Sequence, residues 1–305
     1  MGQDALRQDN LRSPRGPRCI ALVGPFQSGK TSLLEAILAR TGAIPKAGSV
    51  EAGTTIGDSS PEARSHRMSV GLTAATTTFM GDSYTFIDCP GSVEFAHDMR
   101  AALPAVDAAV VVCEADERKL PQLQIIMREL EDMGIPRFLF LNKIDKAKGR
   151  IRDLLENLQP MSAAPLVLRQ VPIWDDGQVT GFVDLAMERA HHYRDHAPSE
   201  VVEMPGDLAE REKQARYQML ERLADHDDHL MEELLSDIEP AQDEVFADVL
   251  ATERVDASCK APASGPGGFT SAKNNLVCST VDKASVSCDA EAFADEMPNL
   301  RQVRR

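Results

Sequence analysis

Gly24-Pro25-Phe26-Gln27-Ser28-Gly29-Lys30-Thr31 is the stretch of the sequence that decides the fold. It fits the pattern G-x-x-x-x-G-K-[ST], in which backbone N–H groups surround phosphate oxygens. The apolar run Cys19–Val23 before it predicts a short buried strand, and Ser32–Arg40 after it predict a helix. A strand, a glycine-containing loop and a helix N-terminus together direct N–H groups and the helix dipole at an anion. The stretch therefore predicts a phosphate-binding loop in an α/β domain.

A carboxylate follows a second strand of the sequence. Residues Tyr84–Ile87 predict this strand, which runs into Asp88-Cys89-Pro90-Gly91. At the end of a strand, Asp88 can hold Mg²⁺ through a water molecule, and the backbone N–H of Gly91 is free to meet a γ-phosphate. The segment is therefore the expected site of the metal and of the terminal phosphate.

A third strand, Arg137–Leu141, ends in Asn142-Lys143-Ile144-Asp145. The Asp145 carboxylate can accept two hydrogen bonds, from the N1–H and the exocyclic amine of guanine. Adenine lacks this donor pair and would leave the carboxylate unpaired, and a site with buried polar groups rejects such a ligand strongly. The three motifs occur in this order and each ends an apolar strand, so together they predict a guanine-nucleotide site.

Strands and helices alternate along residues 18–162. The expected strands are 19–23, 70–79, 84–88, 107–113 and 137–142, and the expected helices are 30–40, 93–102, 120–133 and 150–158. This alternation predicts a doubly wound, mostly parallel sheet with helices on both faces. The long polar loop 42–68 lies between the phosphate-binding loop and Asp88, a position that suits a mobile switch. Glu114 and Asp116 could form a carboxylate pair for acid–base catalysis. We expect them instead to be ordinary polar residues of a strand-to-helix loop.

Residues 163–250 predict an inserted α+β subdomain. Leu166–Pro172 and Val179–Leu185 predict strands joined by a turn at Asp175–Gly177, and a long amphipathic helix is expected over 207–237. A further helix is expected at about 240–250.

The segment 1–17 is polar and lacks the apolar core of a secretion signal, so it is expected to be a disordered leader. The segment 251–305 is expected to be an irregular tail, and its abrupt change of character is what a shift of reading frame would produce.

Charge and cysteine content bound the class of protein. The 305-residue chain carries a net charge of −15, and residues 195–256 account for −14 of it, with 19 acidic against 5 basic side chains. Such an acidic face will not bind nucleic acid, so no DNA partner is expected. The face is either a solvated helix face or a surface for a basic protein. The sequence contains no run of about 18 apolar residues, so no membrane span is predicted. Of the six cysteines, three lie in or beside expected buried strands (Cys19, Cys89 and Cys113), and the three in the tail lack the spacing of a metal site (Cys259, Cys278 and Cys288). A reducing, cytoplasmic compartment is therefore the default expectation.

The motifs together resemble those of a known family. The resemblance is carried by Asp88–Gly91 with Val93-Glu94-Phe95, by Val106–Val112 and Pro136–Asp145, and by Pro172–Trp174 with Gly181–Leu185. Over about residues 18–250 the chain resembles the N-terminal GTP-binding domain of elongation factor G, the translational GTPase, and especially the elongation factor G-like proteins of bacteria. The resemblance implies a monomer that works with the ribosome, in translocation or in ribosome disassembly, by Mg²⁺-dependent hydrolysis of GTP to GDP. It also implies that the acidic helix 207–237 meets the basic ribosomal stalk protein.

Site residues follow from the resemblance, position by position. The residues implied to bind GTP or GDP are Gly24, Gln27, Ser28, Gly29, Lys30, Thr31, Ser32, Asp88, Gly91, Asn142, Lys143, Asp145, Ser271 and Ala272. The implied Mg²⁺ site comprises Thr31, Ser69 and Asp88. The catalytic positions are Lys30, Gly91 and Ser92.

Some of these positions depart from the family pattern. The family loop usually reads G-H-x-D-x-G-K-T, and here Pro25 and Gln27 replace the His and the Asp. The family's switch threonine falls at Ser69. Ser92 stands where a His usually orients the attacking water, which predicts slow hydrolysis. For Ser92 itself we favour the role of N-cap of the following helix.

The last family motif is the weakest match. Thr270-Ser271-Ala272-Lys273 has its letters, but Gly265–Gly268 precedes it in place of an apolar strand. Two alternatives to a GTPase therefore stay open. One is a GTP-switched binding module with negligible turnover. The other is a truncated inactive fragment, in which a missing last strand would leave a sheet edge exposed.

Overall fold

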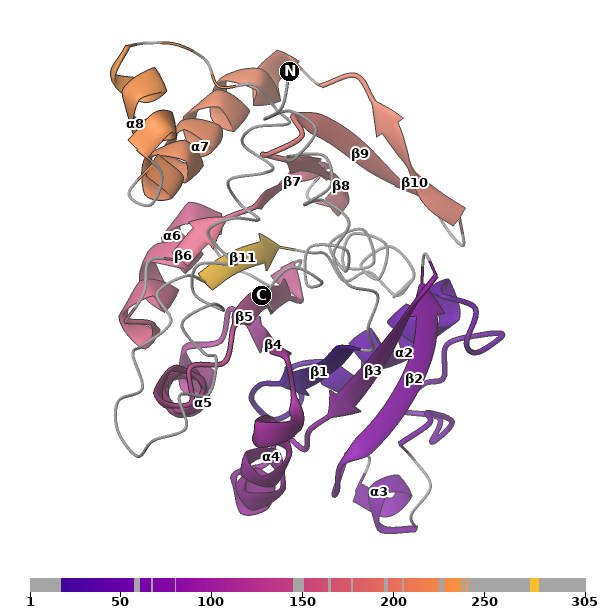
Figure 1. Ribbon diagram of the computed structural model, residues 1–305. Helices are drawn as coiled ribbons and strands as arrows, with labels where there is room; N and C mark the ends of the chain where they lie inside the picture. Colours follow the sequence, from indigo (N-terminus) through magenta and orange to yellow (C-terminus); the bar gives the residue numbers. More distant parts are fainter. Residues whose placement is uncertain are drawn as a thin grey trace.

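Two β-sheets organise the part of the chain that the structure describes. The structure is a computed structural model, and it describes residues 18–57, 61–66, 68–79, 81–144, 151–163, 166–176, 178–194, 197–204, 206–224, 228–236, 238, 240 and 275–279. Within these residues a seven-stranded sheet has the order β2-β3-β1-β4-β5-β11-β6, and a four-stranded sheet has the order β10-β9-β8-β7 (Figure 1).

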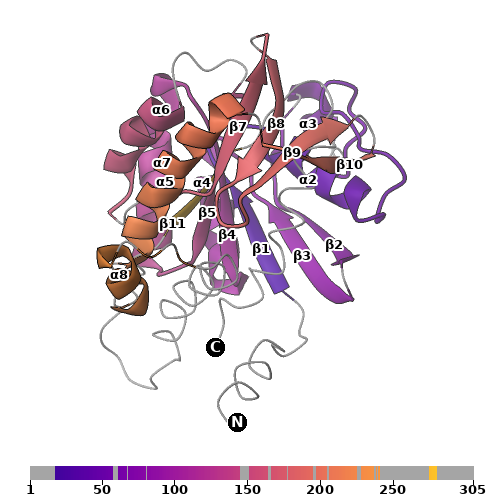
Figure 2. The same ribbon diagram turned by 90° about the horizontal axis from the view of Figure 1, so that it is seen from above.

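The large sheet carries the three motifs. Its strands are β1 (Arg18–Val23), β2 (Thr73–Phe79), β3 (Asp82–Asp88), β4 (Ala108–Glu114), β5 (Arg137–Asn142), β6 (Leu166–Leu168) and β11 (Asn275–Ser279). Only the β2–β3 pair is antiparallel among these described strands. Figure 2 shows the strands side by side from β11 through β5, β4, β1 and β3 to β2. The predicted mostly parallel α/β sheet is confirmed.

Helices cover both faces of this sheet. They are α2 (Lys30–Arg40), α3 (Pro61–His66), α4 (Ala96–Ala102), α5 (Leu120–Asp132), α6 (Ile151–Leu158), α7 (Gly206–Ala224) and α8 (Asp228–Leu235). Alternate side chains of β1 point to opposite faces. Ile20 and Leu22 share a core with α2 and α7, whereas Ala21 and Val23 share the other core with α4, α5 and α6. A strand buried on both faces explains why the run Cys19–Val23 is apolar throughout.

The small sheet is antiparallel and consists of β7 (Gln170–Asp175), β8 (Gln178–Asp184), β9 (Arg189–Arg194) and β10 (Ala197–Val202). The expected strand Leu166–Pro172 is divided, because β6 joins the large sheet and β7 joins the small one. Strands β9 and β10 were not predicted from the sequence. Their sequences are rich in charged and polar residues and contain Pro198, so they lack the apolar alternation by which strands are recognised.

The helix expected over 207–237 is two helices, α7 and α8. Among the described residues α7 ends at Ala224 and α8 begins at Asp228, in whose first turn a carboxylate favours a helix start. The expected apolar stripe does pack, since Met219, Leu220 and Leu223 are buried in the core shared with α2. The helix expected at 240–250 lies almost wholly outside the described residues.

One stretch of the tail differs from expectation. Asn275–Ser279 forms β11, which pairs in parallel with both β5 and β6, so the edge of β5 is covered rather than exposed. The short run Leu276–Cys278 had given too little signal for a strand. Ser271 and Ala272 lie outside the described residues, as does the remainder of 251–305. Every helix in the described ranges is too short or too polar to cross a membrane.

Candidate functional site

The phosphate-binding loop joins β1 to α2, and its backbone requires glycine at two positions. Gly24 has φ +147°, and a Cβ there would lie 2.0 Å from the carbonyl oxygen of Val112. Gly29 has φ +102°, and a Cβ there would lie 2.2 Å from the side-chain nitrogen of Asn142. Both distances are shorter than any real contact of a Cβ. The loop is thus packed directly against the ends of β4 and β5.

Lys30 and Gly91 meet inside this loop. The Lys30 ammonium donates to the carbonyl oxygens of Gly24 and Pro25, each at 3.0 Å. A Cβ on Gly91 would lie 2.2 Å from the Lys30 Nζ and 2.8 and 2.9 Å from the carbonyl oxygens of Pro25 and Gly24, so only glycine fits there. Burial lowers the pKa of Lys30 to about 8, while the Asp88 charge opposes this shift. Two positions predicted from separate motifs are therefore in contact.

Three oxygen-bearing side chains converge beside Lys30. The Thr31 hydroxyl donates to Asp88 Oδ2 at 2.6 Å, and its oxygen lies 3.0 Å from the Ser69 Oγ. The Ser69 hydroxyl is 3.5 Å from the same carboxylate oxygen. Asp88 Oδ1 is buried and accepts no hydrogen bond from the described part of the chain. Burial raises the pKa of Asp88, so a cation at this carboxylate would stabilise its charged form. Hard oxygen donors of this kind fit Mg²⁺.

Glu35 anchors the loop that precedes Ser69, a role that was not predicted from the sequence. Glu35 lies on α2 one turn after Thr31, and it is almost fully buried. Its two carboxylate oxygens accept the backbone N–H groups of Gly48 at 2.8 Å and of Ile56 at 2.6 Å. The signal in the sequence was a charged residue on the apolar face of a helix. The expected switch loop is thereby tied to the helix that carries Thr31.

The guanine motif is also tied to the phosphate-binding loop. The Asn142 amide nitrogen donates to the Ser28 carbonyl at 2.8 Å, and the Asn142 Oδ1 accepts the backbone N–H of Lys143 at 2.9 Å. Lys143 has φ 56° and its ammonium donates to the carbonyl of Gln27 at 2.6 Å. Asp145, the predicted reader of guanine, lies outside the described residues.

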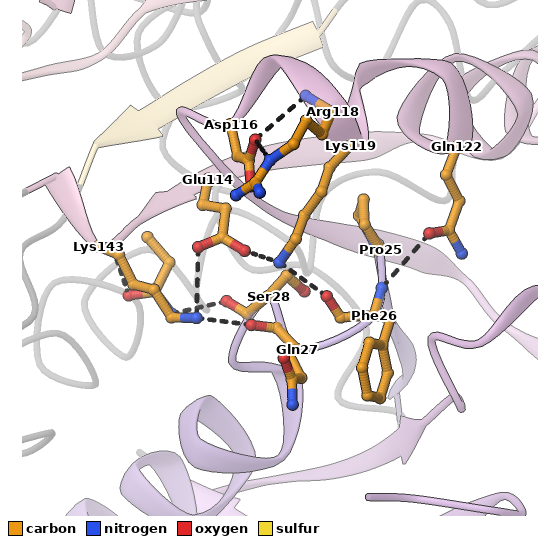
Figure 3. A network of polar contacts seen from close by, with 12 residues as sticks. Pro25, Phe26, Gln27, Ser28, Glu114, Asp116, Arg118, Lys119, Gln122 and Lys143 are labelled. Atoms are coloured by element: carbon orange, nitrogen blue, oxygen red, sulfur yellow. Dashed lines mark hydrogen bonds and ion pairs between the residues drawn. The ribbon is translucent and has the colours of Figure 1, made fainter. Parts of the chain in front are cut away.

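Side chains from the β4–α5 connection complete the loop's surroundings (Figure 3). Glu114 forms ion pairs with Lys119 and Lys143. On α5, the Gln122 amide nitrogen donates to the carbonyl of Gly91 at 2.6 Å, and its oxygen lies 3.5 Å from the backbone N of Phe26. None of these contacts was predicted from the sequence. The sequence contained one indication of these contacts. The residues lie at or after the carboxyl end of the parallel strand β4, where ligand sites of α/β sheets lie.

Three serines of the predicted site are distinguished by their surroundings. Ser92 precedes the short helix Val93–Phe95, but its side chain makes no capping hydrogen bond with the described residues. The expected cap is therefore not formed by the hydroxyl. The Ser28 hydroxyl is buried inside the loop without a partner among the described residues. Ser32 lies in the first turn of α2 and is half-buried.

Comparisons with known proteins give one consistent result. The sequence profile of a family described as "Elongation factor Tu GTP binding domain" matches residues 16–284. An "Elongation factor G-like protein" of Synechocystis sp. is 42% identical over 231 residues, which are 76% of this chain and 34% of the relative. "Elongation factor G 1" of Geobacter sulfurreducens is 28% identical over 221 residues, 72% of this chain and 32% of the relative. The chain thus spans about a third of these curated relatives.

A solved structure agrees with these sequence matches. A crystal structure of a protein from Thermus thermophilus superimposes with a TM-score of 0.76 at 28% identity. The superposition covers 93% of this chain and 40% of the other. The profile match extends to residue 284 and so includes β11.

Proposed function

Because the chain belongs to the elongation factor Tu GTP-binding domain family, we propose that it binds GTP with Mg²⁺ and hydrolyses it to GDP. The observation that carries this proposal is the convergence of Lys30, Gly91 and the Thr31–Ser69–Asp88 oxygens on one side of the phosphate-binding loop. A cation, a glycine N–H and a set of hard oxygen donors are the groups that phosphoryl transfer requires.

The phosphates are bound by the loop from Gly24 to Ser32. Its backbone N–H groups and the N-terminus of α2 face the anion, and Lys30 exchanges its carbonyl partners for the β- and γ-phosphates. Thr31, Ser69 and Asp88 hold Mg²⁺, which when bound neutralises charge on the β- and γ-phosphate oxygens. The Gly91 N–H senses the γ-phosphate. The contact between Ser69 and Thr31 supports this assignment, because it brings the residue that follows the expected switch loop to the same site.

Guanine is read by the segment that follows β5. In this proposal Asp145 accepts the two guanine donors, Asn142 holds the segment against the loop, and the stem of Lys143 packs on the base. The register between β11 and β5 pairs Ser279 with Leu141, directly before Asn142. In this proposal Ser271 and Ala272 support the base, and both lie outside the described residues.

Hydrolysis is slow in this proposal because Ser92 lacks an imidazole. Its hydroxyl is shorter than a histidine side chain and cannot hold a water at the same distance from the γ-phosphate. The same feature favours the second candidate function, a GTP-switched binding module with negligible turnover. Release of phosphate distinguishes the two.

The cellular task proposed here is a ribosome-coupled one, in elongation or ribosome disassembly, by a cytoplasmic monomer. The names of the two curated relatives support the link to elongation factor G. The acidic α7–α8 region is the proposed surface for a basic protein such as that of the ribosomal stalk. Charge complementarity of this type steers association and weakens with added salt.

One pair of measurements tests the proposal. Fluorescent GDP and a fluorescent non-hydrolysable GTP analogue are titrated against the chain with Mg²⁺, with ATP as competitor. Phosphate release from GTP is then followed with and without ribosomes. Guanine-specific binding with slow release supports the GTPase, and binding without any release supports the switch module. Equal competition by ATP and GTP would refute both.

A further inference from the structure

Glu114 lies at the carboxyl end of β4 and joins two lysines that are distant in the sequence. One carboxylate oxygen pairs with the Lys119 ammonium, and the other lies 3.3 Å from the Lys143 ammonium (Figure 3). The Glu114 side chain is only 13% exposed, and those of Lys119 and Lys143 are 24% and 22% exposed. The cluster is therefore largely withdrawn from solvent, where charges that lose their partner are costly.

Each lysine also donates to the phosphate-binding loop. The Lys119 ammonium lies 2.8 Å from the carbonyl oxygen of Phe26, and the Lys143 ammonium lies 2.6 Å from that of Gln27. These two carbonyls are consecutive in the chain. Gln27 has φ 56°, a left-handed conformation that a residue with a side chain adopts only at a cost. The two donated hydrogen bonds therefore hold the loop at the point where its backbone is strained.

The β4–α5 connection is built so that Lys119 reaches Phe26. The Asp116 carboxylate accepts the backbone N–H of Arg118 at 3.1 Å and pairs with the Arg118 guanidinium. This starts the short helix Glu117–Lys119, whose last residue faces the loop. Asp116 therefore has a local structural role, whereas Glu114 contacts both lysines that hold the loop.

The arrangement has a direct consequence for ligand binding. Backbone N–H groups bind an anion only if the carbonyls of the same peptides point away from it and have other donors. Lys119 and Lys143 are those donors for Phe26 and Gln27. The two ammonium groups repel each other, and Glu114 between them offsets this repulsion. Without Glu114 we expect both lysines to leave the carbonyls for solvent.

We propose that Glu114 and Lys119 are positioning residues that, together with Lys143, hold the phosphate-binding loop in its anion-binding conformation. This inference rests on the proposed function and adds two residues to the nucleotide site. They act through the loop rather than through contact with the nucleotide. We therefore expect these residues to change the affinities for GDP and GTP equally, and not the preference for one of them.

The test compares E114Q, K119M and the double variant with the wild-type chain by titration of fluorescent GDP and of the GTP analogue. Each single variant is expected to raise both dissociation constants by roughly ten- to a hundredfold, mainly through faster dissociation. The double variant is expected to bind no more weakly than the weaker single variant, because loss of Glu114 already releases Lys119 from the Phe26 carbonyl. K119M removes a partly exposed side chain and carries the test alone if E114Q does not fold.

E131Q is the matched control. Glu131 on α5 is 14% exposed and pairs with the buried Arg137, away from the loop. We expect E131Q to lower the melting temperature and to leave both dissociation constants unchanged. Dissociation constants of E114Q and K119M within twofold of wild type, or an equal weakening by E131Q, would overturn the inference. A wild-type chain that binds no guanine nucleotide would instead refute the proposed function.

Discussion

The side-chain amide of Gln122 on α5 donates to the carbonyl oxygen of Gly91 over 2.6 Å. Gly91 is the residue whose N–H is proposed to meet the γ-phosphate, so Gln122 holds the peptide next to that N–H. The Gln122 side-chain oxygen also lies 3.5 Å from the backbone nitrogen of Phe26 in the phosphate-binding loop. One side chain thus links the loop that binds all phosphates to the segment that senses the last one.

Q122A should therefore change the preference for GTP over GDP. Loss of one hydrogen bond to a buried carbonyl costs about 1 kcal/mol. The 3.5 Å contact with Phe26 is too long to add much, so the cost falls on the ligand that uses the Gly91 N–H. We expect affinity for the GTP analogue to fall by about fivefold while affinity for GDP stays constant. Competition titrations with both nucleotides measure the ratio. Equal weakening of the two would show that Gln122 does not act through Gly91.

G29A should abolish nucleotide binding. A methyl group there would lie 2.2 Å from the Asn142 side chain, at a backbone φ of +102°. The added Cβ must displace Asn142 or the loop, and both carry the proposed site. We expect the dissociation constant for GDP to rise by at least about a hundredfold.

Gly42 provides the control for this substitution. It also has a positive φ, of +75°, but a Cβ there would meet no atom within 4 Å. G42A should cost about 1 kcal/mol of stability through backbone strain alone and leave the dissociation constant unchanged. Nucleotide binding by G29A as tight as that by G42A would contradict the packing argument.

Local patterns explain why much of the site could be predicted from the sequence. The loop Gly24–Thr31 and the residues at the ends of β3 and β5 are contiguous motifs after apolar strands, and strand order in a parallel sheet brings such ends together. The contacts of Glu35 and Lys119 depend instead on which side of a helix or loop faces the site. No short-range pattern encodes that direction.

Long-range pairing explains the remaining misses. β11 is a strand only because β5 and β6 offer it partners on both sides, and its own sequence is too short to indicate this. The polar edge strand β10 likewise depends on β9. The expectation for Asp145 stays a prediction, since that residue lies outside the described part of the chain.

Nucleotide binding should take up protons near pH 8. Burial lowers the pKa of Lys30 to about 8, and burial together with the Lys143 charge lowers the pKa of Lys119 to about 8. Anionic phosphates favour the charged amines and raise both pKa values, so binding is tightest below pH 8 and weakens as the pH rises through it. Calorimetry of GDP binding at pH 8, in buffers of different ionisation enthalpy, measures the uptake.

K119M separates the two lysines in this experiment. The variant retains Lys30, so we expect a smaller but non-zero proton uptake at pH 8. Affinity for GDP that is constant between about pH 7 and 9 in the wild-type chain would contradict the role of both amines.

E35Q should loosen the loop before Ser69. The two carboxylate oxygens of Glu35 accept separate backbone N–H groups, from Gly48 and Ile56. A glutamine must turn its NH₂ toward one of them, which costs about 1–3 kcal/mol at a buried position. Hydrogen exchange in a peptide spanning residues 44–57 should accelerate by about tenfold or more. In the exposed control E62Q on α3 the same peptide should exchange as in the wild-type chain.

S92H tests whether the missing imidazole limits turnover. Ser92 makes no side-chain hydrogen bond at the start of the helix Val93–Phe95 within the described residues, so its replacement should leave stability within about 0.5 kcal/mol. An imidazole next to Gly91 can orient and polarise a water that the serine hydroxyl does not reach. Positioned groups of this kind contribute about a hundredfold or more, so phosphate release should rise by that order with GDP affinity unchanged. S92A should release phosphate at the wild-type rate. If S92H is no faster than S92A, with or without ribosomes, the slow step lies elsewhere and Ser92 is not what limits hydrolysis.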